Sequence, residues 1–101
     1  MRERRSSYNG AAEVWIDGVK CKDLDVRLSG YVDVSEIRTF GGVEYMDGPT
    51  SWDGYFVNLS QHDAFELTGK QLDLKLSNGQ TGRAVLTDIS GLLQGVRETP
   101  F

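Results

Sequence analysis

The stretch from Gly69 to Gly91 constrains the fold more than any other part of the chain. Its first half, QLDLKLS, places a leucine at every second position and a polar residue between. Period-two alternation of this kind is typical of a strand with one buried face. Asn78-Gly79 then gives the commonest short hairpin signal, because both residues tolerate a positive φ. Residues 83–89 are rich in β-branched side chains, which suit a pleated sheet, so the stretch predicts a β-hairpin.

The register of this hairpin has two interpretations, which differ in the length of the loop. A two-residue loop sets Leu74 opposite Arg83. A loop one residue longer sets Leu74 opposite Ala84 and Leu72 opposite Leu86. The two interpretations exclude each other, because a one-residue slip exchanges the faces of a strand. We favour the longer loop, since the shorter one places an unpaired charge beside leucines.

Short strands separated by turn residues are also expected along the rest of the chain. The sequence predicts turns at Asp17-Gly18, Ser29-Gly30 and Gly41-Gly42. The apolar pattern changes phase near Lys22-Asp23, which predicts a β-bulge, and again near Ser35-Glu36. Such bends favour a closed barrel over a flat open sheet.

One short helix is expected near residues 61–68. Ser60 with Asp63 three residues later has the pattern of a helix N-cap, and Gly69 can end the helix. We therefore predict an all-β fold, a small single-domain barrel of six or seven antiparallel strands, with this helix over one end. Residues 11–101 would form the barrel domain.

The first ten residues differ from the rest of the chain in composition. MRERRSSYNG is polar and has no apolar period, so we expect residues 1–10 to be a flexible basic arm. The whole chain has a formal net charge of −4, so the remainder is acidic. An acidic body argues against a nucleic-acid partner and favours a partner protein with a basic surface.

The sequence contains no arrangement typical of an enzyme. His62 is the only histidine, and no cysteine lies at metal-binding spacing from it, so a zinc site is not expected. Neither a phosphate-binding glycine motif nor a nucleophile elbow is present. Cys21 is the only cysteine, which favours a reducing compartment, and no apolar run approaches the roughly 20 residues of a transmembrane helix. We expect a soluble protein without catalytic activity, metal, cofactor or membrane contact.

The best candidate for a binding segment is residues 47–54, DGPTSWDG, interpreted as a turn-rich loop. It contains Trp52, and exposed tryptophan and tyrosine are enriched among interface anchors. Trp52 has a second interpretation, as a lid that folds back over the barrel core. The candidate partner-contact residues are Trp52, Tyr45, Tyr55, Asp47 and Asp53.

Three segments carry a resemblance to known sequences. They are LDLKLSNGQTGRAVLTDIS, the upstream GGVEYMDGPTSWDGYF, and the ending Thr99-Pro100-Phe101. Over residues 31–101 the chain resembles small, uncharacterised β-rich proteins of actinobacterial phages and prophages. The resemblance implies a phage or prophage origin, with the protein in the cytoplasm of the host cell or in the virion, and implies no activity.

We therefore expect a non-enzymatic β-barrel interaction or structural protein. Its partner would be another protein, either a host protein or a virion neighbour, and a second copy of the chain would also fit. The alternative is a barrel that binds a small nucleotide-type ligand. In that case Arg2, Arg4 and Arg5 would close over the anion.

Overall fold

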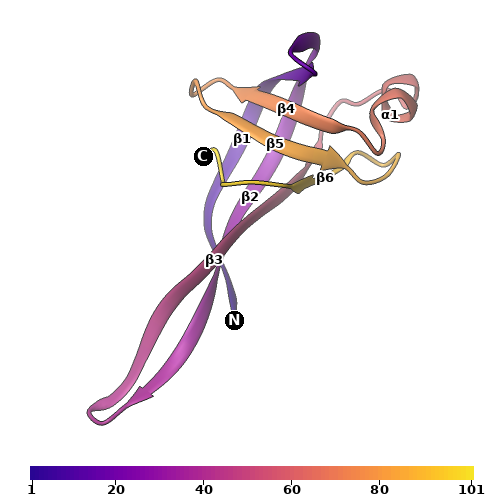
Figure 1. Cartoon of the computed structure of the whole chain (residues 1–101). Coiled ribbons are helices and arrows are strands. Elements are labelled where there is room, and N and C mark those ends of the chain that lie inside the picture. Colours follow the sequence, from indigo (N-terminus) through magenta and orange to yellow (C-terminus); the bar gives the residue numbers. More distant parts are fainter.

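The computed structural model describes residues 1–101, and its architecture is mostly β. Six antiparallel strands close in a ring in the order β1-β2-β3-β6-β5-β4, and one helix, α1, connects β3 to β4 (Figure 1). The predicted small all-β barrel with one short helix is thus confirmed. The bounds are β1 Arg2–Ile16, β2 Val19–Thr39, β3 Gly42–Phe56, α1 Gln61–Leu67, β4 Gln71–Leu76, β5 Thr81–Leu86 and β6 Leu92–Gly95.

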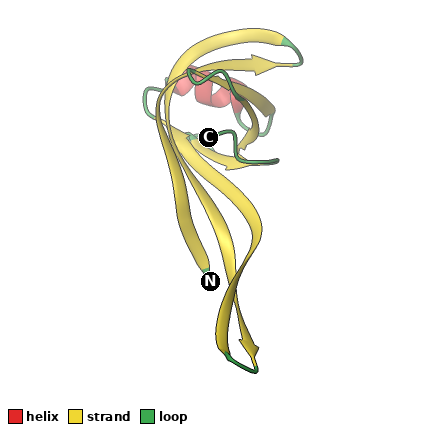
Figure 2. Ribbon diagram, turned by 90° about the vertical axis from the view of Figure 1, so that its left-hand side faces the viewer, coloured by secondary structure: helices red, strands yellow, loops and turns green.

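The ring is built from three long and three short strands. β4 pairs with β1 only over Ala12–Trp15, and β6 pairs with β3 only over Asp53–Tyr55. The short strands therefore close the ring around one end of the long ones. The other ends of β2 and β3 project well beyond it, as Figure 2 shows, and the molecule measures 57 × 26 × 22 Å.

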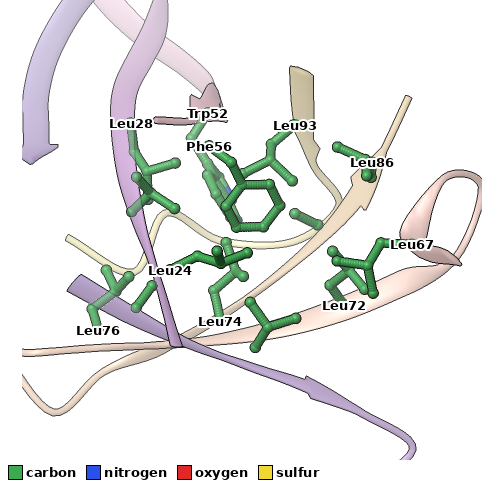
Figure 3. Packing of buried hydrophobic residues seen from close by; sticks show 14 residues of the cluster. Leu24, Leu28, Trp52, Phe56, Leu67, Leu72, Leu74, Leu76, Leu86 and Leu93 are labelled. Atoms are coloured by element: carbon green, nitrogen blue, oxygen red, sulfur yellow. The ribbon is translucent and has the colours of Figure 1, made fainter. Parts of the chain in front are cut away.

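Alternating side chains of the strands fill the ring with a single apolar core of 14 buried residues (Figure 3). β2 has buried side chains at every second position from Leu24 to Val34, apart from Gly30. The predicted turn at Ser29-Gly30 is therefore wrong. Glycine is required there for close approach rather than for turning, because a Cβ at position 30 would collide with the Ser6 side chain.

Trp52 lies at the centre of this core. It is fully buried, and its Nε1 donates a hydrogen bond of 2.9 Å to the carbonyl oxygen of Arg97. The Phe101 ring meets it edge-on, with 6.0 Å between centroids. A Cβ at Gly95 would collide with the indole ring. The interpretation of Trp52 as a surface anchor is therefore wrong, because the interior holds both its ring and its polar N–H.

The β4–β5 hairpin has a register that differs from both sequence interpretations. Leu72 pairs with Ala84, and Leu74 pairs with Gly82. Ala84 and Leu86 are nevertheless buried with the leucines, as the favoured interpretation requires. The faces were thus predicted correctly, while the pairing is displaced by two residues.

The loop and one ion pair explain this displacement. The N–H of Leu76 donates to the carbonyl of Gln80, so the three-residue loop covers residues 77–79, one position earlier than the favoured interpretation places it, and Gly79 adopts a φ of 87°. A three-residue loop with glycine in the left-handed region is a common hairpin connection. Asp73 then lies opposite Arg83, with 3.0 Å between Oδ1 and Nε. The charge of Arg83, which the shorter-loop interpretation left unpaired, therefore has a direct partner.

The first hairpin agrees closely with the sequence. Asp17-Gly18 forms the predicted turn with φ values of 50° and 80°, as a type I′ turn requires. The predicted bulge occurs one residue early, at Cys21 instead of Lys22-Asp23, between the partners of Val14 and Trp15. Cys21 is exposed, as are its neighbours in this part of β2.

The helix α1 starts and ends as the sequence predicts. Ser60 is its N-cap and accepts a hydrogen bond of 3.2 Å from the N–H of Asp63. Ala64 and Leu67 are buried, and Leu67 belongs to the core cluster. Gly69 follows the helix with a φ of 81°. The chain has no helix with the length and apolar character needed to cross a membrane.

The N-terminal residues form a strand instead of the predicted flexible arm. Arg2 already pairs with Asp33 of β2, and the terminal ammonium donates to the carbonyl of Val34 at 2.8 Å. Backbone pairing with β2 orders this polar segment, although it supplies few side chains to the core. The boundary expected between residues 10 and 11 therefore lies inside β1.

Candidate interaction site

Beyond Val34 the sheet narrows from three strands to two. Residues 35–47 form this two-stranded part, which we call the hairpin arm, and it points away from the ring (Figure 1). β1 ends beside Val34, and β3 does not meet β6 before Asp53. The arm therefore has a free edge on both sides. The predicted loop at residues 47–54 is wrong, because this whole segment belongs to β3.

The base of the arm contains an irregularity that the Gly-Pro sequence explains. Gly48 and Pro49 lie together opposite the single residue Asp33, since the pairing shifts at this point. Proline lacks an N–H and is tolerated at bulges and edges. Arg5 reaches Asp47 at 3.0 Å and so connects β1 to the base of the arm.

The hairpin arm exposes an unusual number of large apolar side chains. Every residue from 35 to 47 is exposed, and no other layer of the molecule covers either face. Phe40 occupies the turn at the tip and has no cover at all, with 112% relative exposure. The large apolar residues of the arm are Ile37, Phe40, Val43, Tyr45 and Met46.

The register places the side chains of the arm on two mixed faces, because directly paired residues of a ribbon share a face. Neither face is apolar throughout, so the ribbon cannot act as half of a dry core. One face, which we call the Glu44 face, carries the pairs Ile37–Glu44 and Ser35–Met46. The other face carries the pairs Glu36–Tyr45 and Arg38–Val43.

A second feature lies where the arm joins the ring, on the outer face of the long strands. An open hollow of about 610 Å³ is lined there by arginine and tyrosine side chains, and we call it the arginine–tyrosine hollow. Beside it, Arg2 forms an ion pair of 2.9 Å with Asp53 and lies 3.6 Å above the Tyr31 ring. The principal lining residues are Arg4, Arg27, Tyr31, Asp53, Tyr55 and Leu92.

The charges around this hollow are unbalanced. Asp53 is already paired with Arg2, whereas Arg4 and Arg27 form no ion pair. The hollow is therefore cationic, although the whole chain has a net charge of −4. A ligand or partner that enters it should present negative charge.

The structure distributes the predicted site residues over several places. It brings most of them to the arm or the hollow and removes the tryptophan from the surface. Tyr45 and Asp47 lie on the arm, Tyr55, Asp53, Arg2 and Arg4 lie at the hollow, Arg5 lies at the base of the arm, and Trp52 lies in the core.

Four residues that define these surfaces were not among the predicted contact residues. Phe40 had a visible signal, since a large apolar residue directly before Gly41-Gly42 is unusual in a turn. Ile37 follows the change of phase predicted near Ser35-Glu36 and was not considered as a contact residue. Arg27 and Tyr31 are four residues apart and share the outer face of β2, but the turn predicted between them concealed this relation.

No group of three or more histidine, cysteine, aspartate or glutamate residues is placed to hold a metal ion.

Three ionisable groups have shifted pKa values, and all three lie outside the arm and the hollow. A hydrogen bond to Glu13 raises the pKa of Lys20, one from Lys22 lowers the pKa of Asp63, and one from the Ser90 side chain lowers the pKa of Asp88.

The fold and these two surfaces define a small all-β protein whose closed sheet carries a projecting two-stranded arm. A scan against protein-family models, a search of curated proteins and a search of solved structures found no match to this chain. The exposed arm and the cationic hollow are therefore the basis for assigning a function.

Proposed function

We propose that this chain is a non-enzymatic interaction or structural protein that binds another protein through its hairpin arm. The observation that carries the proposal is the exposure of five large apolar side chains on a ribbon without a covering layer. These side chains belong to Ile37, Phe40, Val43, Tyr45 and Met46.

A ribbon of this kind gains most of its stability from a partner. A two-stranded hairpin without a third strand or a packed face is only marginally stable in water. Covering the exposed apolar surface would contribute about 25 cal/mol for each Å² removed from water. Aromatic side chains and methionine are also enriched at protein interfaces, and Phe40, Tyr45 and Met46 supply both kinds.

The charged residues of the arm indicate how it avoids random association. Glu36, Arg38 and Glu44 separate the apolar side chains along both strands. Charges at such positions discourage edge-to-edge aggregation of exposed strands. They also suit a partner whose surface provides charge as well as apolar contact, so binding should slow as salt is added.

We further propose a phage or prophage origin, because the sequence pattern of residues 31–101 resembles that of small β-rich proteins of actinobacterial phages. In that setting the partner is a virion neighbour or a host protein. Both are proteins with which a projecting arm can form a long, narrow interface.

Site-specific photocross-linking in the host cell tests the proposal. A photoreactive phenylalanine analogue is placed at position 40, and the control places it at position 65, where Phe65 is also exposed but lies on α1. We expect discrete protein adducts from position 40 and none from position 65. The same adducts from both positions, or none from either, would overturn the proposed role of the arm.

A further inference from the structure

We propose that the partner of the arm is a second copy of this chain, whose arginine–tyrosine hollow receives the Glu44 face. This inference rests on the proposed function, because it names the occupant of the same arm. The chains would then assemble head to tail, with the arm of each copy in the hollow of the next.

Charge is the first reason for this assignment. Glu44 forms no ion pair within its own chain, and its face of the arm carries no cation. Arg4 and Arg27 form no ion pair either, and both line the hollow. Two copies of a chain with a net charge of −4 repel each other over most of their surfaces. The hollow is the cationic exception, and the carboxylate of Glu44 suits it.

Apolar contact is the second reason. Glu44 is flanked on its face by Ile37 and Met46, which are 37% and 58% exposed. In the hollow, Tyr55 and Leu92 lie opposite each other on β3 and β6 and are 41% and 48% exposed. Each surface thus places apolar groups beside a charge, negative on the arm and positive in the hollow. The two surfaces can therefore be buried against each other without leaving an unpaired ion.

The path of the chain makes the contact intermolecular. β2 and β3 run without interruption from the hollow, at Arg27 and Tyr55, to the tip at Phe40. An arm continuous with the wall of its own hollow cannot fold back into it. Two different surfaces meet in such a contact, so the interface is heterologous and generates either a closed ring or a filament.

Sedimentation velocity of the full chain over a wide concentration range provides the test. We expect the wild-type chain to form species larger than a monomer. Glu44→Arg in the arm and Arg27→Glu in the hollow should each weaken association by about tenfold or more, because like charges then meet. Combining both substitutions in one chain restores opposite charges and should restore assembly. Mixing the two single variants should also restore it.

Matched controls separate this contact from a general effect of charge. Glu36→Arg makes the same change on the opposite face of the arm, and Arg97→Glu reverses an exposed arginine outside the hollow. Both controls should assemble as the wild type does. Arg4→Glu serves as a second hollow variant if circular dichroism shows that Arg27→Glu does not fold.

Several results would overturn the inference. They are a wild-type chain that stays monomeric throughout, single variants that assemble normally, and a double variant without rescue. Binding of ATP to the monomer, detected by shifts in the NMR signals of Tyr31 and Tyr55, would assign the hollow to a small anion instead.

The cross-linking experiment distinguishes failure of this inference from failure of the proposed function. An adduct between position 40 and the hollow of another copy supports both. An adduct with a different protein keeps the arm as a binding site and removes the second copy as its partner. Absence of any adduct overturns both.

Discussion

The ring and the hairpin arm are built from the same two strands, yet they differ in how they treat apolar side chains. In the ring, β2 buries alternate residues from Leu24 to Val34, and β3 buries Trp52 and Phe56. In the arm, the same strands expose Ile37, Phe40 and their neighbours. Antiparallel pairing continues through both regions, so hydrogen bonding does not account for the difference.

The difference lies in what covers each face. The ring closes on itself, so the inward face of every strand meets other inward faces and becomes dry. The arm has no opposing layer, and its cross-strand pairs combine apolar with charged residues, as in Ile37–Glu44. The ring therefore supplies the stability of the fold, while the arm leaves its apolar side chains exposed.

The largest difference in stability is expected between a truncation in the core of the ring and a truncation at the tip of the arm. Trp52→Ala removes a fully buried ring together with its hydrogen bond to Arg97. We expect it to lower the free energy of unfolding by about 3–5 kcal/mol, as for other large-to-small core changes. Phe40→Ala should leave it within about 0.5 kcal/mol of the wild type. Urea denaturation measures both, and equal losses would show that the tip is part of the folded core.

A smaller effect is expected when most of the arm is removed. Replacing residues 37–44 by Asn-Gly connects Glu36 to Tyr45 through a two-residue turn. Glu36 and Tyr45 are already paired across the two strands, so they suit such a turn. Because the deleted residues contact nothing in the ring, the free energy of unfolding should change by about 0.5 kcal/mol or less. A loss of several kcal/mol in thermal or urea denaturation would mean that arm and ring fold as one unit.

The parts of the ring that local patterns determine could be predicted from the sequence. Alternating leucines in QLDLKLS, the Asp17-Gly18 turn and the Ser60 N-cap each depend on residues a few positions apart. The hairpin register could not be predicted, because a cross-strand ion pair between Asp73 and Arg83 and the position of the three-residue loop at residues 77–79 decided it.

The continuation of β3 through residues 47–54 could not be predicted, because this segment has the features of turns. Gly48-Pro49 and Asp53-Gly54 are turn signals, but here they mark a bulge and a close approach of strands. A Cβ at Gly54 would collide with the backbone of Arg27 in the neighbouring strand. Such requirements depend on partners distant in the chain, which one sequence does not reveal.

The two surfaces were only partly predictable, for the same reason. Tyr45 and Tyr55 were recognised as contact candidates from their residue type. The hollow, however, depends on the pairing of Asn9, Arg27 and Tyr55 across three strands. Trp52 illustrates the opposite error, since a tryptophan among turn residues reached the core through a strand that was not predicted.

The smallest effect is expected from lowering the pH, which should weaken the contact between α1 and the ring before it affects the arm. The hydrogen bond from Lys22 of β2 holds the pKa of Asp63 below its ordinary value, and the Ser60 hydroxyl adds to the effect. The unfolded chain therefore binds a proton at this carboxyl more tightly than the native state does. Stabilisation from the pair is present above the ordinary aspartate pKa of about 4 and is lost as the pH falls through the lower native value.

Lys22→Met provides the control for this effect. At neutral pH the variant should melt at a lower temperature than the wild type, and the difference should disappear at acidic pH as Asp63 is protonated. In the wild-type chain, the rate of amide exchange, corrected for its intrinsic pH dependence, should rise at Ala64 in α1 as the pH falls. The rate at Tyr45 in the arm should stay unchanged. If the difference in melting temperature persisted in acid, the Lys22 stem would be acting through packing rather than charge, and the helix would be held to the ring by apolar contact alone.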